Sequence, residues 1–116
     1  MVGLEVFDYK VEGYFSPYGF DTWKVAFLHS AKRFTREGIT YLERHTQTDE
    51  VFVLLAGRAT LLMGETADPA EMEQVKLYIV KQAEWHNIIV SEDAEILIVE
   101  NADTGTHNTE YMPYHF

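Results

Sequence analysis

The sequence predicts an all-β protein in which two sheets enclose a single core. Short apolar stretches are separated by turn-forming residues every several positions, and almost no stretch has helical periodicity. The stretches 51–55 and 61–63 are apolar at nearly every position, which is typical of strands packed on both faces. A hydrophobic content of 47%, with seven tyrosines and seven phenylalanines, is typical of a folded, β-rich chain. We therefore expect a sandwich or barrel of the double-sheet jelly-roll type.

Length and composition limit the class of protein. A chain of 116 residues corresponds to one domain, which we divide into an N-terminal arm (1–20), a barrel (21–100) and a C-terminal tail (101–116). Nineteen acidic and nine basic residues give a net charge of −10, which argues against nucleic-acid and anionic-membrane partners. The absence of cysteine excludes disulfides and thiolate metal ligands. Because there is neither a signal-peptide core nor an apolar run long enough to cross a bilayer, we expect a cytoplasmic protein.

The N-terminal arm is rich in glycine, proline and aromatic residues and is predicted to form a loop or an edge extension. Its aromatic side chains are Tyr14, Phe15, Tyr18 and Phe20. We expect them to pack against the outside of the core, although they could instead cover a barrel mouth or an interface.

A strand is expected over residues 23–28. Trp23, Val25, Phe27 and His29 share one parity along it. We expect this apolar face to point inward. His29 would then either add a metal ligand at the border of the cavity or be a hydrogen-bonded core or rim residue.

The remaining segments alternate between loops and strands. Residues 30–38 are predicted to form a charged loop, from which an arginine could reach an anionic ligand. Residues 64–74 are predicted to form an acidic, solvated loop, within which residues 69–72 are the one stretch that could form a short helix. Further strands are predicted at 76–80, 85–90 and 95–100. In the polar tail, His107 and His115 are expected to face solvent.

The most informative stretch runs from residue 39 to residue 57 and is predicted to be a hairpin. One face of its first strand carries Tyr41, Glu43, His45 and Gln47. One face of the returning strand carries Glu50, Phe52 and Leu54. His45 and Glu50 can therefore meet across the mouth of the hairpin. A histidine and a carboxylate that converge in this way form either a metal site or a buried hydrogen bond.

This hairpin resembles the first motif of the cupin superfamily. In that motif a glycine precedes His-x-His, a glutamate follows after three or four residues, and a second glycine follows after six more. His45, Glu50 and Gly57 have this spacing. Gln47 occupies the position of the second histidine, and Gly38 lies one residue too far upstream.

A later stretch resembles the second cupin motif, in which Pro-x-Gly-x-x-His is followed by an asparagine. Only His86 matches this pattern. The departures are Lys81 for the proline, Ala83 for the glycine, Val75 for an earlier glycine and Val90 for the asparagine. The resemblance covers residues 20–100 and implies a small single-domain cupin, with a double-stranded β-helix (jelly-roll) barrel.

The resemblance also implies a metal site. A typical cupin binds a divalent metal through three histidines and one glutamate. In this chain the matching set is His45, Glu50 and His86, with Gln47 as a weak fourth ligand. Two histidines and a carboxylate suit iron, manganese, nickel or zinc. The alternative is a metal-free pocket in which His45 is hydrogen-bonded to Glu50.

Two classes of function follow from the resemblance and stay open. One is a metal-dependent isomerase, lyase or dioxygenase acting on a small polar molecule. In a metal-free site Glu50 could be the general base, and Tyr41 could touch the substrate. The other class is a non-catalytic small-molecule-binding protein, or a structural dimer without metal. A homodimer is the expected assembly, because cupins often pair through their sheets.

Overall fold

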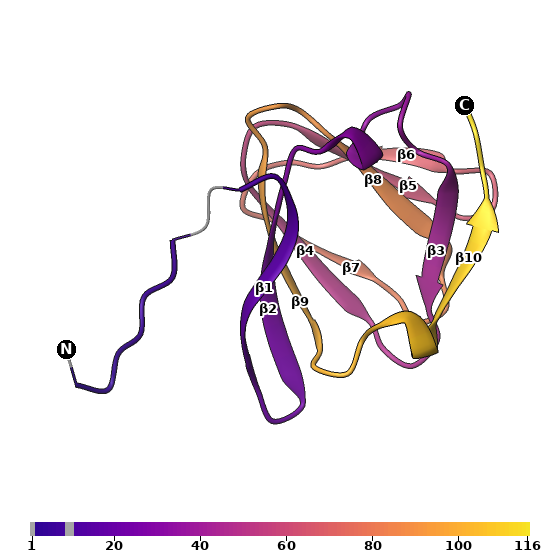
Figure 1. The fold of residues 1–116 in the computed structure, drawn as a ribbon. Coiled ribbons are helices and arrows are strands. Elements are labelled where there is room, and N and C mark those ends of the chain that lie inside the picture. The colour runs from indigo at the N-terminus through magenta and orange to yellow at the C-terminus, as the bar shows by residue number, and fades with distance from the viewer. Residues whose placement is uncertain (1, 9–10) are drawn as a thin grey trace.

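The computed structural model describes residues 2–8 and 11–116, in which ten strands form two five-stranded antiparallel sheets (Figure 1). One sheet has the order β1-β2-β9-β4-β7 and the other the order β10-β3-β8-β5-β6. The strands are β1 (Gly13–Phe20), β2 (Trp23–His29), β3 (Tyr41–His45), β4 (Glu50–Ala56), β5 (Ala59–Met63), β6 (Asp68–Glu71), β7 (Leu77–Val80), β8 (His86–Val90), β9 (Glu95–Asn101) and β10 (Thr109–Pro113). Two short 3-10 helices are η1 (Lys32–Phe34) and η2 (Thr106–Asn108). The predicted all-β jelly roll is confirmed.

The main core lies between the two sheets and consists of side chains of one parity on each strand. β4 and β9 are neighbours inside one sheet, with Phe52 opposite Ile98 and Leu54 opposite Ile96. All four side chains are buried in the same cluster as residues of β5 and β8 from the facing sheet. Removing this apolar surface from water is the main force that holds the sheets together.

The inward face of β2 is the opposite of the predicted one. Ala26 and Leu28 are buried in the core, so the odd-numbered residues point to the outer side of the sheet. The even-numbered parity also carries two apolar residues, Ala26 and Leu28, and parity alone therefore does not show which side faces the core. His29 lies on the outer side, with Nε2 3.9 Å from a carboxylate oxygen of Glu95. A ligand role for His29 at the cavity is therefore wrong.

The segment 64–74, predicted to be a loop that could contain a short helix at 69–72, contains the strand β6 instead. β6 pairs with β5 in a hairpin, with Leu61 opposite Ala70 and Met63 opposite Asp68. A single helical turn makes too few hydrogen bonds to offset its nucleation cost, whereas the neighbouring strand supplies a ladder of them.

Both ends of the chain add strands to the sheets. β1 lies at a sheet edge and pairs with β2. β10, which lies in the segment predicted to be a tail, pairs with β3 and places Thr109 opposite His45. The C-terminal strand therefore lies directly beside the strand that carries the predicted site (Figure 1). His107 and His115 are exposed, as predicted. Across residues 2–8 and 11–116, no helix has the length and apolar character that crossing a membrane requires.

Two residues that replace motif glycines keep a conformation that glycine favours. Val75 and Ala83 have φ angles of 64° and 65°, in the left-handed region that residues with a Cβ rarely adopt. The N–H of Ala83 donates to the carbonyl of His45 at 2.8 Å, and the N–H of Val75 donates to the carbonyl of Leu54 at 3.0 Å. These turns tie the segments on either side of β7 to the strands of the site. At these two positions the backbone therefore has a conformation that favours glycine, although the residue carries a Cβ.

Candidate functional site

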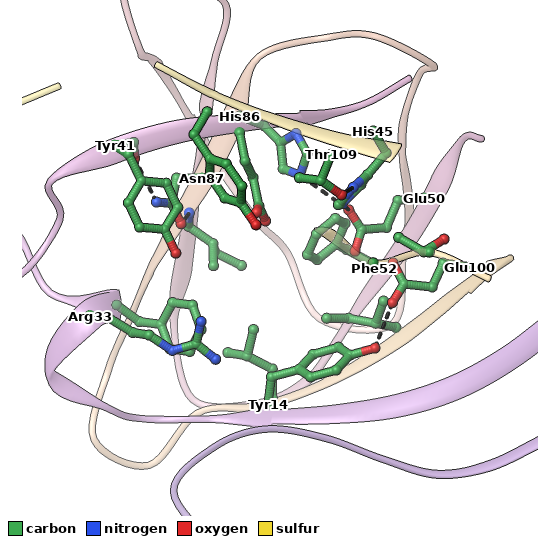
Figure 2. Close-up of a pocket in the computed structure, with 18 of the residues that line it drawn as sticks. Tyr14, Arg33, Tyr41, His45, Glu50, Phe52, His86, Asn87, Glu100 and Thr109 are labelled. Atoms are coloured by element: carbon green, nitrogen blue, oxygen red, sulfur yellow. Dashed lines mark hydrogen bonds and ion pairs between the residues drawn. The ribbon is translucent and has the colours of Figure 1, made fainter. Parts of the chain in front are cut away.

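A pocket of about 380 Å³ opens between the two sheets and contains most of the predicted site residues (Figure 2). Its polar side chains come from both sheets and from η1. They include Tyr14, Lys24, Arg33, Tyr41, Glu43, His45, Glu50, His86, Asn87, Glu100, Thr109 and Tyr111. A cavity of this size and mixed polarity is suited to a small molecule.

Three buried side chains meet at the centre of the pocket. Glu50 Oε1 lies 3.1 Å from Nε2 of His45 and 3.1 Å from Nε2 of His86. They converge because β3 ends at His45, β4 begins at Glu50 and β8 begins at His86. The predicted meeting of His45 and Glu50 across the mouth of the hairpin is confirmed.

The partners of His86 require a proton or a metal cation between its ring and Glu50. Nδ1 lies 3.0 Å from the carbonyl oxygen of Glu84, which can only accept, so this nitrogen carries a hydrogen. Nε2 faces the Glu50 carboxylate, whose oxygens are also acceptors when it is ionised. A neutral ring with its hydrogen on Nδ1 would bring two acceptors together. A proton or a metal cation must therefore lie on the line between Nε2 and the carboxyl group.

Electrostatics place that proton on the histidine. Burial lowers the pKa of His86, but the hydrogen bond and the charge of Glu50 outweigh burial and raise this pKa overall. Burial alone would raise the pKa of Glu50. The hydrogen bonds from His45 and His86 have a larger effect in the opposite direction and hold this pKa well below its usual range. Without a metal, the centre therefore holds a carboxylate and at least one imidazolium.

β10 positions the second histidine. Nδ1 of His45 lies 3.0 Å from the Thr109 hydroxyl oxygen, which can donate or accept a hydrogen bond. Burial lowers the pKa of His45, and Glu50 raises it by a larger amount. Thr109 is not found by sequence reasoning, because it reaches His45 across 64 residues of chain.

A second buried carboxyl group, that of Glu100, lies close to the first. One of its oxygens accepts a 2.5 Å hydrogen bond from the Tyr14 hydroxyl and lies 3.8 Å from Lys24 Nζ. Burial and the nearby charge of Glu50 raise the pKa of Glu100 to about 7. Burial and the bond to Glu100 raise the pKa of Tyr14, so the phenol stays protonated. Glu100 can therefore take up or release a proton near neutral pH.

Sequence reasoning misses this carboxyl group. The signal that could have identified it is parity, because Glu100 continues the buried face of Ile96 and Ile98 on β9. A charged residue on an inward-facing row of a central strand is uncommon unless it is paired or functional. Tyr14, which we expected outside the core, lines the same pocket.

The other end of the pocket is aromatic and polar (Figure 2). The rings of Tyr41 and Tyr111 pack edge to face with centroids 5.2 Å apart. The Asn87 side chain donates a 2.9 Å hydrogen bond to the carbonyl of Tyr41. Arg33, from the loop in which we expected an arginine to reach a ligand, also lines this end. Aromatic faces, an amide and a guanidinium together suit a planar or anionic group of a ligand.

Gln47 lies outside this arrangement. β3 ends at His45, and Gln47 is exposed in the bend that follows, so the prediction that it shares the inward face is wrong. Glu43, two residues before His45 on the same strand, lines the pocket. Burial raises the pKa of Glu43, whereas the nearby histidines lower it by a smaller amount.

The donor set could hold a metal ion. Donor atoms of Glu43, His45 and His86 lie within 4.8 Å of one another, as do those of His45, Glu50 and Glu100. Imidazole nitrogens and carboxylate oxygens are suitable ligands for first-row divalent metals. The second ring nitrogen of each histidine already has a hydrogen-bond partner, which is how metal-binding imidazoles are usually oriented.

Comparison with known proteins finds solved structures with a similar fold. No protein-family profile and no curated protein sequence matches the chain. A uridine-bound Pac13 from Streptomyces matches with a TM-score of 0.69 and 8% identity over 97% of this chain and 95% of that one. A cupin from Bacteroides fragilis matches with a TM-score of 0.64 and 13% identity, over 93% and 95% of the two chains.

A third match is a cupin-2 domain protein from Shewanella frigidimarina. Its TM-score is 0.62 at 14% identity, and the match covers 80% of this chain and 84% of that one. Identities this low establish a common fold and leave activity open. The fold implied by the two sequence motifs is thus confirmed: the chain has the fold of the small cupins.

Proposed function

We propose that this protein is a lyase that removes water from a small hydroxylated molecule bound in the pocket. The observation that supports this most strongly is the presence of two proton-transfer groups at the centre. One is the histidine pair held in the charged form by Glu50. The other is Glu100, with a pKa of about 7. A carboxyl group with such a pKa exchanges protons in both directions at neutral pH.

Elimination of water needs a base and an acid, and the pocket contains both. In the proposed step ionised Glu100 takes a proton from a carbon next to a carbonyl group. The electrons of that C–H bond form a C=C bond as the C–O bond at the next carbon breaks. The His45 imidazolium donates its Nε2 proton to the departing hydroxyl group, which leaves as water. Donor atoms of His45 and Glu100 lie within 4.8 Å, close enough to act on adjacent atoms of one substrate.

The two residues that we predicted to be catalytic take supporting roles in this proposal. Glu50 is a weak base, because its hydrogen bonds to two histidines lower its pKa. It acts as a positioning residue that keeps His45 and His86 charged and fixed. Tyr41 packs against Tyr111 and binds the part of the substrate that does not react.

Similarity to Pac13 supports dehydration over other reactions. Pac13 is a nucleoside dehydratase, and its structures include complexes with uridine. Uridine is small and hydroxylated at one end and planar at the other. This distribution corresponds to the two ends of the pocket. Uridine is therefore a reasonable first probe for binding.

A metal-dependent form of this function is the second candidate. The position of two imidazole nitrogens at 3.1 Å from one carboxylate oxygen favours it. His45, Glu50 and His86 would hold the ion, and Glu43 or Glu100 would add a further oxygen ligand. Iron, manganese, nickel or zinc bound there supplies Lewis acidity toward a carbonyl or hydroxyl oxygen.

The test is a screen for water loss with matched variants. Purified protein, with and without added Mn²⁺ or Zn²⁺, is incubated with hydroxylated aldehydes, hydroxy acids and nucleosides including uridine. Mass spectrometry detects products that have lost one water. We expect Glu100→Gln to reduce the rate by about 10²–10⁴-fold, the usual contribution of a general base.

His107→Gln is the control, because this histidine is exposed and outside the pocket. It should retain the wild-type rate. Full activity of Glu100→Gln would remove Glu100 as the base. If panel members bind and shift the His45 and His86 NMR signals without losing water, the protein belongs to the alternative class, a non-catalytic small-molecule-binding module.

A further inference from the structure

Arg33 is held at one side of the pocket by the short helix η1. A 2.9 Å hydrogen bond from the N–H of Phe34 to the carbonyl of Ala31 closes this helical turn. The Phe34 ring is buried in the main core and anchors the helix there. The Arg33 guanidinium lies over this ring, with Cζ 4.5 Å from the ring centroid, a contact that is favourable for a cation. A buried partner therefore positions the guanidinium, although Arg33 itself is exposed.

The guanidinium of Arg33 has no anionic partner within the chain. Across residues 2–8 and 11–116, no carboxylate forms an ion pair with it. Its charge acts on Glu43, which also lines the pocket. Burial raises the pKa of Glu43, and the charges of the two histidines and of Arg33 lower this pKa by a smaller amount. A guanidinium has five N–H donors and no acceptor, so the partners left to Arg33 are water or a ligand.

The other cationic side chain of this kind in the pocket is already matched. Lys24 Nζ lies 3.8 Å from Oε1 of Glu100 and donates a 3.0 Å hydrogen bond to the carbonyl of Thr104. Its charge is therefore matched by a carboxyl group at the reacting centre. Among the lysines and arginines that line the pocket in the described part of the chain, Arg33 alone has a charge available to a ligand.

Arg33 and Glu100 lie on opposite sides of the cavity (Figure 2). The Arg33 side chain points into the cavity on the side of Tyr41, whereas Glu100 lies beside Glu50. Arg33 is therefore remote from the groups that would transfer protons. A molecule whose reacting carbons lie at Glu100 would place its other end at the guanidinium.

We propose that Arg33 binds an anionic group, a carboxylate or a phosphate, at the end of the substrate that does not react. This names the substrate class of the lyase proposed above and rests on that function. The planar guanidinium can bind two oxygens of either group through parallel hydrogen bonds. The anionic group keeps all its bonds during the elimination. The substrate is thus a hydroxylated carbonyl compound with a carboxylate or phosphate at its far end.

Isothermal titration calorimetry with matched ligands tests this proposal. D-glucose, D-glucuronate and D-glucose 6-phosphate differ only at the terminal carbon, and uridine and uridine 5′-phosphate form a second series. We expect an anionic member to bind at least about tenfold more tightly than the neutral member of its series, because hydrogen bonds to charged groups are the stronger ones. The anion that binds more tightly identifies the group as a carboxylate or a phosphate.

Three variants assign the preference to one side chain. Arg33→Gln removes the charge and should abolish the preference for anions, with the affinity for neutral members unchanged. Arg33→Lys keeps the charge without the planar donor pair and should keep part of the preference. Arg36→Gln is the matched control, because Arg36 is exposed in the same loop, lies 4.1 Å from the centroid of the Phe116 ring and does not line the pocket. It should keep the wild-type preference.

Calorimetry needs no turnover, so the anion site and the lyase can fail separately. A preference for anions that depends on Arg33, without water loss from any substrate, would keep the anion site and remove the lyase. Water loss from neutral substrates, without a preference for anions, would do the reverse. Equal affinity for neutral and anionic members would overturn the proposal. So would the absence of binding by every anionic member, or a preference that persists in Arg33→Gln.

Discussion

At the scale of single residues, the centre of the pocket combines groups that are costly to bury alone. Glu50 and His86 are almost inaccessible to water, and Oε1 of Glu50 and both ring nitrogens of His86 have polar partners. A buried ion pair with its hydrogen bonds satisfied is tolerated, whereas removing one partner leaves an uncompensated charge. Because folding gains little from such a pair, its presence beside a cavity points to function.

The stability of the protein should depend on the charge of Glu100. Its pKa rises from 4.5 to about 7 in the folded chain, so the native state retains a proton that the unfolded state loses. Between these values the free energy of unfolding therefore falls as the pH rises. Glutamine at this position cannot ionise, so Glu100→Gln should raise the free energy of unfolding by about 1–3 kcal/mol at pH 8. At pH 4 the carboxyl group is protonated in the folded chain, and the substitution should change the free energy of unfolding little.

Urea denaturation of both proteins at the two pH values measures this effect. Tyr14→Phe serves as a control, because it removes the hydrogen bond and keeps the carboxyl group. A Glu100→Gln effect of equal size at pH 4 and pH 8 would mean that Glu100 has an ordinary pKa in the folded chain.

Metal binding should depend on His86 and be insensitive to Gln47. His86→Ala removes a nitrogen donor from the centre of the pocket and should weaken Mn²⁺ or Zn²⁺ binding at least tenfold. Gln47→His should leave affinity unchanged, because residue 47 is exposed in a bend outside the pocket. Competition titration against a chelating dye measures both. A large gain in affinity for Gln47→His would show that the end of β3 rearranges around a metal.

At the scale of elements, two turns of left-handed conformation flank β7, and the second of them leads into β8, which carries His86. Val75 and Ala83 are strained there, and valine more so because its β-branched side chain is bulkier. Val75→Gly should stabilise the protein by about 1 kcal/mol, the strain relieved less the greater entropy of glycine in the unfolded chain. Ala83→Gly should give a smaller gain.

The midpoint of urea denaturation reports these differences. Ala102→Gly is the comparison, because this exposed turn residue is not among those with a positive φ in the described part of the chain. It should have no stabilising effect. Destabilisation by Val75→Gly would mean that the valine side chain contributes packing that exceeds its backbone strain.

The hairpin of β3 and β4 could be predicted from sequence, because it depends on local spacing. Period-two alternation places Tyr41, His45 and Glu50 on the pocket side, and the structure agrees. The prediction for Gln47 is wrong because the alternation of side chains ends where the strand ends. The ends of secondary-structure elements are the least predictable feature of a sequence. For β2 the pattern is ambiguous, since apolar residues occur on both of its faces.

The remaining parts of the site depend on contacts between distant segments. Thr109 and Tyr111 enter the pocket only because β10 pairs with β3, and Tyr14 enters because β1 pairs with β2. Glu100 is in contact with Tyr14 across 86 residues of chain. No local pattern encodes such pairings, although parity along β9 alone places Glu100 on the inward face with Ile96 and Ile98.

At the scale of the whole molecule, the sheet β1-β2-β9-β4-β7 separates the pocket from one outer side of the protein. On β2, Lys24 lines the pocket and the neighbouring Val25 points to the outer side. On β9, Glu100 lines the pocket and Val99 points to the outer side. A substitution on the outer side of these two strands is therefore expected to alter the position of Lys24 or Glu100.

The state of the His86 ring tests the central claim most directly, because both proposed functions depend on the cation between His86 and Glu50. Long-range ¹H–¹⁵N NMR of metal-free protein at pH 6 reports which ring nitrogens carry hydrogen. We predict hydrogens on both nitrogens of His86, and loss of the Nε2 hydrogen when Zn²⁺ is added. A neutral His86 with its hydrogen on Nε2 alone, unchanged by Zn²⁺, would contradict the charged centre and the metal site together.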